Sequence, residues 1–177
     1  MKIEIEGRAR RLGDDIHTDA IIRSSRKKDT LDPEALKRYL LESVDPDFAA
    51  SVVPGDVLVA GKNFGLGSSR EHAPTVIKMA GVSAVLAKSV ARIFFRNAIN
   101  VGLPVLITDT DKIKDGDELE VDLASGTIKD VTNGAKIGFN PLPEVMLNIL
   151  DEGGLIPYIN KHKGFDVKPA ATAKGRK

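Results

Sequence analysis

The chain has 177 residues, with 26 Lys and Arg against 25 Asp and Glu, and a formal net charge of +1. This length fits one domain with a sizeable core, and no apolar run approaches the roughly 20 residues that a membrane-spanning helix needs. Cys is absent, which excludes disulfides, thiolate catalysis and cysteine-ligated clusters within this chain.

The first elements alternate between strand and helix signals. Residues 2–9 alternate with period two and predict a strand. Because this charged start lacks the apolar core of a signal peptide, we expect a cytoplasmic protein. A polar loop, 13–19, then leads into Ala20-Ile21-Ile22. Asp32-Pro33 has the pattern of an N-cap followed by Pro at the first helical position, and predicts a helix through Leu41.

The most informative segment is 61–74, Gly-Lys-Asn-Phe-Gly-Leu-Gly-Ser-Ser-Arg-Glu-His-Ala-Pro, which joins an expected strand, 57–60, to an expected helix, 75–80. Its three glycines let the backbone turn sharply and approach a small ligand. Two hydroxyls and a guanidinium then stand where the helix should begin, a position that favours an anion. The segment therefore predicts a carboxylate or phosphate site at Ser68, Ser69 and Arg70.

A structural alternative gives Ser68 no chemistry. Ser68 and Glu71 fit a capping box, in which the serine contributes about 1 kcal/mol of stability. Pro74 opposes this interpretation, because it would lie six residues into a helix capped by Ser68 and cost roughly 3 kcal/mol there. Pro74 fits only if the helix begins close to it. Residues 68–71 would then form an irregular turn that faces the anion.

The rest of the chain shows two different patterns of predicted secondary structure. After Gly81, a predicted helix end, come a strand at 82–87, a helix at 90–100 that ends at Gly102, and a strand at 103–107. Strand–helix–strand–helix–strand implies a parallel sheet with crossover helices. In the later segments, apolar and polar residues alternate, and turn signals separate one segment from the next. This pattern predicts an antiparallel meander followed by a helix. These segments are the strands 118–123 and 127–131 and the helix 142–150.

Charge is distributed unevenly along the chain. Residues 161–177 hold six Lys and Arg and one acid, and subtracting these from the totals leaves 20 basic and 24 acidic residues before them. We expect one folded domain over 1–163 and a disordered basic tail over 164–177, which lacks apolar periodicity. No aromatic residues interleave with the charges of 168–177, so we expect no nucleic-acid partner.

Several of these motifs resemble those of a known protein family. The segment 61–74 resembles the signature of the aconitase superfamily's swivelling domain, and 15–22, 91–102 and 153–158 resemble further motifs of that domain in the same order. The resemblance covers about residues 3–162. As a separate short chain, the sequence is similar to the small subunits of the isopropylmalate dehydratase and homoaconitase group.

The resemblance implies an α/β fold: an aconitase-type swivelling β/β/α domain, with a mostly parallel sheet, crossover helices and a C-terminal antiparallel meander. It implies a hydro-lyase that acts only with a large subunit, in a heterodimer or heterotetramer. That subunit would carry a [4Fe-4S] cluster whose open iron polarises the substrate hydroxyl. We expect this chain to bind no cofactor and no metal, since it lacks Cys and its three histidines have no tight spacing to carboxylates.

Site residues follow from the same resemblance. Ser68 resembles the family's proton-abstracting base, Ser69 and Arg70 its residues for the substrate carboxylate, and Asp19 its supporting aspartate. A Ser hydroxyl is a poor base, so Arg70, backbone N–H groups and the metal-bound substrate would have to stabilise the alkoxide in a dry site. For His17 a loop histidine bonded to backbone is as consistent as a role in the site. We expect solvated or packing roles for Arg92 and Arg96.

The implied substrate is a small hydroxy-di- or tricarboxylate, and isopropylmalate, an intermediate of leucine biosynthesis, fits the group best. The sequence departs from the isopropylmalate pattern after Ile22, where Arg23, Arg26, Lys27 and Lys28 replace an apolar segment. These cations suit a further carboxylate, as in a homoaconitase-type enzyme. The alternative is a solvated loop without a role in specificity. A non-catalytic carboxylate-binding or structural module is the remaining possibility, and we expect no membrane partner.

Overall fold

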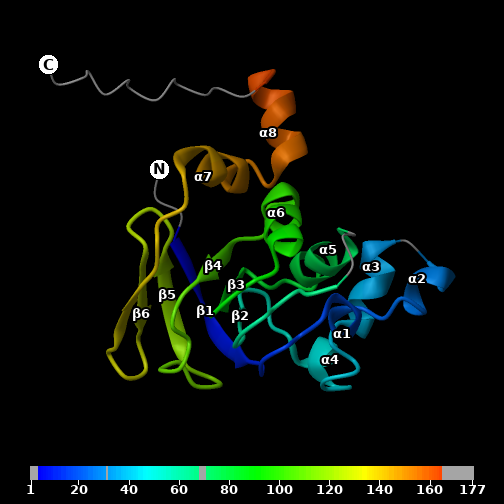
Figure 1. The fold of residues 1–177 in the computed structure, drawn as a ribbon, viewed down its shortest axis with the longest axis horizontal. Coiled ribbons are helices and arrows are strands. Elements are labelled where there is room, and N and C mark those ends of the chain that lie inside the picture. The colour runs from blue at the N-terminus through cyan, green and yellow to red at the C-terminus, as the bar shows by residue number, and fades with distance from the viewer. Residues whose placement is uncertain (1–3, 31, 68–70, 165–177) are drawn as a thin grey trace, which may run out of the picture.

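The computed structural model describes residues 4–30, 32–67 and 71–164, without the side chains of Lys27 and Asp29 (Figure 1). Its strands are β1 (Glu4–Arg11), β2 (Val57–Val59), β3 (Ala84–Ala87), β4 (Val105–Ile107), β5 (Glu118–Asp122), β6 (Thr127–Asp130) and β7 (Lys136–Gly138). Its helices are α1 (Thr18–Ile21), α2 (Arg26–Asp29), α3 (Pro33–Leu36), the 3-10 helix η1 (Lys37–Tyr39), α4 (Phe48–Ser51), α5 (His72–Met79), α6 (Arg92–Val101), α7 (Glu144–Asp151) and α8 (Leu155–His162).

The strands form one sheet in the order β4-β3-β2-β1-β5-β6-β7. The pairs β1–β2, β2–β3 and β3–β4 are parallel, whereas β1–β5, β5–β6 and β6–β7 are antiparallel. β1 belongs to both halves, because its C-terminal end pairs with β2 and its N-terminal end with β5. The predicted parallel sheet with crossover helices and the predicted C-terminal meander are both confirmed.

The sheet curls so that its two ends approach each other. Immediately after β4 and β7, Thr108 and Phe139 form an isolated antiparallel bridge. The Thr108 hydroxyl also donates a hydrogen bond of 3.0 Å to the carbonyl of Gly138. Since β4 and β7 are the outermost strands of the order, this contact joins the two edges and leaves less exposed strand edge.

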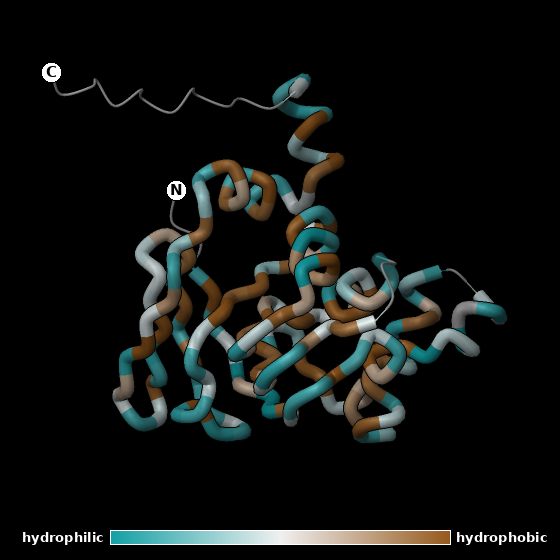
Figure 2. Tube along the Cα trace, in the orientation of Figure 1, coloured by the Kyte–Doolittle hydropathy of each residue, from teal (hydrophilic) through white to brown (hydrophobic). Residues whose placement is uncertain are grey.

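Two hydrophobic clusters lie on the two faces of the parallel strands. Leu58, Val85 and Val105 belong to the cluster beneath the helices α1, α3, α5 and α6, and the alternate residues belong to the cluster inside the curl with α7 and α8. This alternation follows from the period of two along a strand. Figure 1 shows α7 above the antiparallel half, α8 above α6, and the other helices beside the parallel half. Figure 2 shows hydrophobic residues gathered along the strands between them.

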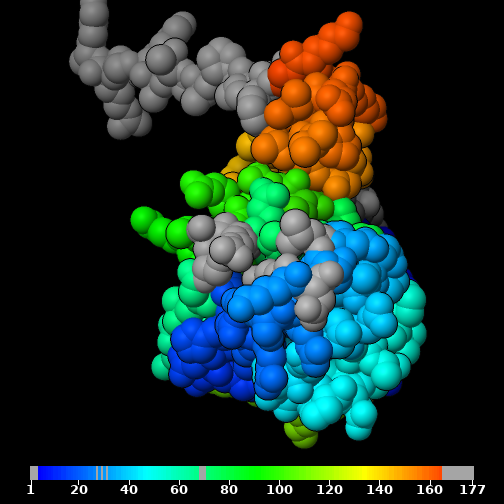
Figure 3. Space-filling view, turned by 90° about the vertical axis from the view of Figure 1, so that its right-hand side faces the viewer, coloured from blue at the N-terminus to red at the C-terminus, as the bar shows by residue number. Residues whose placement is uncertain are grey.

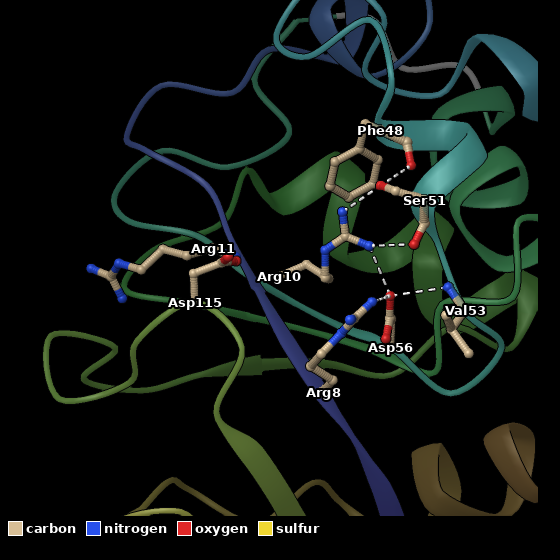
Figure 4. A network of polar contacts seen from close by, with 8 residues as sticks. All are labelled: Arg8, Arg10, Arg11, Phe48, Ser51, Val53, Asp56 and Asp115. Atoms are coloured by element: carbon tan, nitrogen blue, oxygen red, sulfur yellow. Dashed lines mark hydrogen bonds and ion pairs between the residues drawn. The ribbon is translucent and has the colours of Figure 1, made fainter.

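A buried carboxylate fastens α4 and the turn before β2 to β1 (Figure 4). Asp56 Oδ2 accepts hydrogen bonds from Arg10 Nη1 at 2.9 Å, from the Val53 N–H at 3.1 Å and from Arg8 Nη2 at 3.3 Å. Arg10 also donates to the Ser51 carbonyl at the end of α4, at 3.0 Å. Burial alone would raise the pKa of Asp56, but the bonds from Val53, Arg10 and Arg8 outweigh it and lower this pKa.

Several helices differ from the expectation. The helix expected from Asp32 to Leu41 starts as predicted, with the Asp32 side chain accepting from the Glu34 N–H, but it tightens into η1 after Leu36. The segment after the loop 13–17 forms the short helix α1. Helix α8 and the four-residue helices α2 and α4 were not expected. Gly81 and Gly102 follow α5 and α6 at positive φ, +98° and +78°, as their predicted role as helix ends requires.

Candidate active site

Three loops meet at the carboxyl ends of β1, β2 and β3. They are 12–17, the glycine loop 60–67, and 88–91. In parallel α/β sheets this edge is where ligands bind, because the strand ends and the helix starts leave backbone and side chains free to face a crevice. Figure 3 shows this side of the molecule, with blue segments from the start of the chain directly below green segments of the middle of the chain. Motifs far apart in the sequence therefore share one surface.

The glycine loop runs alongside the loop that follows β1. Three backbone hydrogen bonds of 2.8 Å join them: Asp15 N–H to Lys62 O, Gly65 N–H to Ile16 O, and Thr18 N–H to Leu66 O. These bonds bring the start of α1, with Asp19, beside the end of the glycine loop. The described part of the glycine motif, 61–67, is thus adjacent in the fold to the motif 15–22.

The third loop supports the glycine loop from its other side. The Phe64 N–H donates to Ser89 O at 3.0 Å, and the Ala91 N–H donates to Phe64 O at 2.9 Å. The Phe64 ring meets the Phe94 ring of α6 edge-on, with centroids 5.1 Å apart. Phe64 is fully buried, so it anchors the centre of the glycine loop in the core beneath α6.

The glycines of this loop make room for its neighbours. A Cβ on Gly61 would lie 1.7 Å from Asp14 Oδ1, and one on Gly65 would lie 2.3 Å from the Phe94 ring. Gly67 has φ +117°, and a Cβ there would lie 2.8 Å from the Thr18 hydroxyl. We expected the glycines to bring the backbone close to a ligand, but Gly61 and Gly65 bring it close to other parts of the chain.

The backbone amides of the glycine loop divide into two groups. The five N–H groups from Gly61 to Gly65 all donate within the chain. Their acceptors are, in order, Gly13 O, Asp14 Oδ1, Ser89 Oγ, Ser89 O and Ile16 O. Within the part of the chain that the structure describes, the N–H groups of Leu66 and Gly67 make no hydrogen bond. Among the described residues, the amides of this loop that remain available to a ligand are therefore those at its end, Leu66 and Gly67.

Ser68, Ser69 and Arg70 lie outside the described residues, so their predicted roles stay predictions. The flanking structure is informative. Helix α5 begins at His72, with Glu71 at the N-cap and Pro74 third in the helix. Pro is tolerated there because the first-turn N–H groups have no intrahelical partner. Glu71 at the N-cap is not in the third helical position that the capping box requires, so the described start of α5 does not support that alternative.

Asp19 lies in α1 and connects the motif 15–22 to the segment 23–28, which holds Arg23, Arg26, Lys27 and Lys28 and which we call the basic loop. Its Oδ1 accepts hydrogen bonds from the backbone N–H of Ser24 at 2.7 Å and from the Ser24 hydroxyl at 2.6 Å. The neighbouring Thr18 is buried beside Gly67. Asp19 thus lies between the end of the glycine loop and the start of the basic loop, and its supporting role stays a prediction.

The basic loop is partly neutralised within the chain. Arg26 forms a bidentate pair with Glu42, with both N–O distances 2.9 Å, and its guanidinium lies 4.1 Å from the centroid of the Tyr39 ring. Arg23 Nε lies 3.9 Å from the same carboxylate. Hydrogen bonding from Arg26, followed by the charges of Arg26 and Arg23, lowers the pKa of Glu42. Lys28 is exposed, and the side chain of Lys27 is not described.

The remaining candidates from the sequence, Arg92, Arg96 and His17, have exposed side chains. Arg92 and Arg96 are exposed on α6 and make no ion pair with the described residues, as expected for solvated arginines. His17 is the N-cap residue of α1, and its exposed side chain makes no capping hydrogen bond.

Sequence reasoning missed four polar residues that tie the loops together: Asp14, Asp15, Asn63 and Ser89. Two signals were available: the paired acids Asp14-Asp15 in a turn, and the Asn before Phe64. Asn and Asp tolerate the left-handed turns that such loops need.

Comparisons with known proteins agree with this arrangement. Residues 22–110 match the family described as the aconitase C-terminal domain. The chain is 57% identical over 160 residues to the 3-isopropylmalate dehydratase small subunit 2 of Archaeoglobus fulgidus, covering 90% of this chain and 97% of that protein. It is 49% identical over 163 residues to the isopropylmalate/citramalate isomerase small subunit of Methanocaldococcus jannaschii, covering 91% and 96%.

A solved structure gives the same result. The crystal structure of a 3-isopropylmalate dehydratase from Methanocaldococcus jannaschii aligns with a TM-score of 0.86 at 46% identity, covering 91% of this chain and 96% of that one. Sequence and fold therefore agree over nearly the whole length of the relatives. The chain belongs to the aconitase family, in its group of 3-isopropylmalate dehydratase small subunits.

Proposed function

We propose that this protein is the small subunit of a two-chain 3-isopropylmalate dehydratase. In that enzyme it would interconvert 2-isopropylmalate and 3-isopropylmalate by dehydration and rehydration, a step of leucine biosynthesis. The observation that carries the proposal is the meeting of the motif loops at one edge of the parallel sheet, in a chain 57% identical to a named small subunit. Because both chains match over almost their full lengths, the correspondence includes the site region.

Within this site, Ser68 takes the proton from the carbon next to the hydroxyl-bearing carbon. Ser69 and Arg70 bind a substrate carboxylate, and Asp19 holds the start of the basic loop beside them. The N–H groups of Leu66 and Gly67, which the fold leaves without partners among the described residues, add donors at the same place. Such donors can stabilise an alkoxide only in a site from which water is excluded. We infer that closure against the partner excludes it.

The iron–sulfur cluster belongs to the partner. This chain has no Cys, and the described residues hold no group of three or more His, Asp or Glu that could bind a metal ion. Its residues thus do not fit a cluster, and we place the [4Fe-4S] cluster on a large subunit in a heterodimer or heterotetramer. When bound there, the cluster supplies a Lewis acid for the substrate hydroxyl. This chain binds the carboxylate and moves the proton.

The basic loop bears on the substrate. Because Arg26 and Arg23 already face Glu42, their charges are not available in full to a third carboxylate. This pairing favours isopropylmalate over an acid with a further carboxylate. The alternative, a homoaconitase-type or other polycarboxylate hydratase, rests on exposed Lys28, on Lys27 and on any release of Arg26 from Glu42.

The test is reconstitution with a large subunit. The chain is co-expressed with its cluster-bearing partner, purified without oxygen, and assayed for interconversion of the two isopropylmalates by chromatography. The proposal predicts that the complex interconverts the two isopropylmalates. A complex in which the two subunits assemble but do not interconvert them would refute it.

The cytoplasmic location and the division into a domain at 1–163 and a tail at 164–177 stay predictions. Among the described helices, none is long and apolar enough to cross a membrane.

A further inference from the structure

Two residues beside the proposed site have left-handed backbone conformations without being glycine. Asp15 has φ +57° and Asn63 has φ +59°, a region that is uncommon for other residues and best tolerated by Asn and Asp. Their side chains meet: Asn63 Nδ2 donates to Asp15 Oδ1 at 2.7 Å, between residues 48 positions apart in the chain. A hydrogen bond between two left-handed turns is a specific arrangement that neither loop can form alone.

The third loop completes this contact. The Asn63 N–H donates to Ser89 Oγ at 2.8 Å, while the Asp15 N–H donates to Lys62 O at 2.8 Å. Asn63 therefore touches the loops after β1 and β3 at once, one through its side chain and one through its backbone. We call Asp15, Asn63 and Ser89 the three-loop clasp.

Along the chain, Asp15 and Asn63 of the clasp each come shortly before residues of the proposed site. Asp15 comes four residues before Asp19, and Asn63 comes five residues before Ser68. Beyond the clasp the two loops run side by side through Gly65–Ile16 and Thr18–Leu66. A slip of one residue between them would move the start of α1 by about 3.3 Å relative to Leu66, the rise of an extended residue. Placement errors of about 1 Å can already reduce turnover a hundredfold.

We propose that Asp15 and Asn63 are positioning residues of the isomerisation, and that their side-chain hydrogen bond sets the register between the Asp19 loop and the loop that carries Ser68 to Arg70. This inference rests on the proposed function, because the register affects turnover only if those residues carry the chemistry. The side chains of Asp15 and Asn63 are exposed, so the bond between them adds little to global stability. A role in packing and a role in positioning therefore predict different results.

Asn63→Gly is the informative variant. Glycine adopts the left-handed conformation without strain, so the turn remains while the amide that reaches Asp15 is lost. We expect an unchanged or slightly higher melting temperature, a kcat lower by about 10- to 100-fold, and a KM changed far less. Asp15→Gly should do the same, and the double variant should lose no more than either single variant, as expected for two residues that act as one unit. Asp15→Asn keeps the Oδ1 acceptor and should restore most of kcat.

Lys163→Gly is the matched control. Lys163 also has a left-handed backbone, with φ +53°, at the end of α8. Lys163→Gly likewise replaces a left-handed residue with glycine, but far from the clasp in the chain, and we expect the kcat of this variant to equal that of the wild type.

Hydrogen exchange tests the register without any substrate. In the full-length small subunit, the Gly65 and Thr18 amides, which donate between the two loops, should exchange at least about tenfold faster in Asn63→Gly than in the wild type, since local opening governs exchange. Their rates in Lys163→Gly should not change. Faster exchange together with reduced kcat supports the inference. A kcat within twofold of the wild type, or unchanged exchange, overturns it. If the wild-type complex itself is inactive, the proposed function fails, and the exchange rates alone decide whether the clasp sets the register.

Discussion

Removing the carboxylate of Asp56 should destabilise this protein far more than removing a surface carboxylate that makes an equally short ion pair. Asp56 is 3% exposed, and its partners Arg10 and Arg8 are 12% and 41% exposed. In this nearly dry site, Asp56→Ala would leave the Val53 N–H without its acceptor and the Arg10 guanidinium without its counter-charge, with only its bonds to Ser51. Breaking a buried ion pair by removing one partner typically costs about 3–5 kcal/mol, and Arg8, being more exposed, adds little.

Glu120→Ala is the matched control. Glu120 and Lys129 are also 2.9 Å apart, but they are 47% and 46% exposed. For such a pair we expect a loss of about 0–1 kcal/mol. With roughly 2–4 °C per kcal/mol for a chain of this size, Asp56→Ala should lower the melting temperature by about 6–20 °C and Glu120→Ala by less than about 4 °C. Equal shifts in the two variants would refute the role assigned to burial.

The pH dependence of the Asp56 contribution has a definite sign. The folded-state pKa of Asp56 is lowered from its ordinary value of 3.8. The unfolded chain therefore binds a proton more readily, and the stabilisation is present above that value and lost as the pH falls through the folded-state pKa. The difference in unfolding free energy between wild type and Asp56→Asn should be full at neutral pH and shrink in acid. A difference that stays constant on acidification would contradict this assignment.

Three further predictions concern the site. The chain alone, reconstituted anaerobically with iron and sulfide, should show no cluster absorbance and no turnover, and a bound cluster or dehydration without a second chain would count against the division of labour. Arg70→Lys in the complex should raise KM for the dicarboxylate, because the bidentate fork is lost although the charge remains; an unchanged KM would remove Arg70 from the carboxylate site. On a panel of isopropylmalate, citramalate, citrate and homocitrate, isopropylmalate should be the best substrate, and Lys28→Ala should leave that ranking unchanged. If Arg26 or Lys28 meets a third carboxylate, homocitrate should lead, and Arg26→Ala or Lys28→Ala should reduce its kcat/KM by about ten- to more than a hundredfold.

Much of the parallel half could be predicted from the sequence, because each element carries a local signal. Strands β2 and β3 are apolar runs that end at polar loops, and Gly102 closes α6 in the left-handed conformation that its position predicted. Pro74 correctly indicated that α5 begins close to it. These features depend on short-range sterics and hydrogen bonding, which a sequence pattern reports directly.

The rest depends on contacts between distant segments. The Asp15–Asn63 hydrogen bond joins residues 48 positions apart, and no local pattern distinguishes it from two solvated turns. Helix α8 follows Gly153-Gly154 and had no local signal of its own. A Cβ on Gly154 would lie 2.7 Å from Asn100 O, so this glycine lets the α7–α8 corner pack on α6. Helices α2 and α4 have four residues each, too few to show a helical period. The pairing of Arg26 with Glu42 depends on a fold that brings residues 16 positions apart together.

The measurement that tests the central claim most directly is kcat of the reconstituted complex carrying Ser68→Ala, beside Ser125→Ala as a control from an exposed turn of the antiparallel half. The account predicts that Ser68→Ala lowers kcat for isopropylmalate by at least about a hundredfold, the size of a lost general base, with assembly and melting temperature unchanged. Ser125→Ala should keep full activity. A Ser68→Ala complex that retains kcat would contradict the account and leave Ser68 with a structural role.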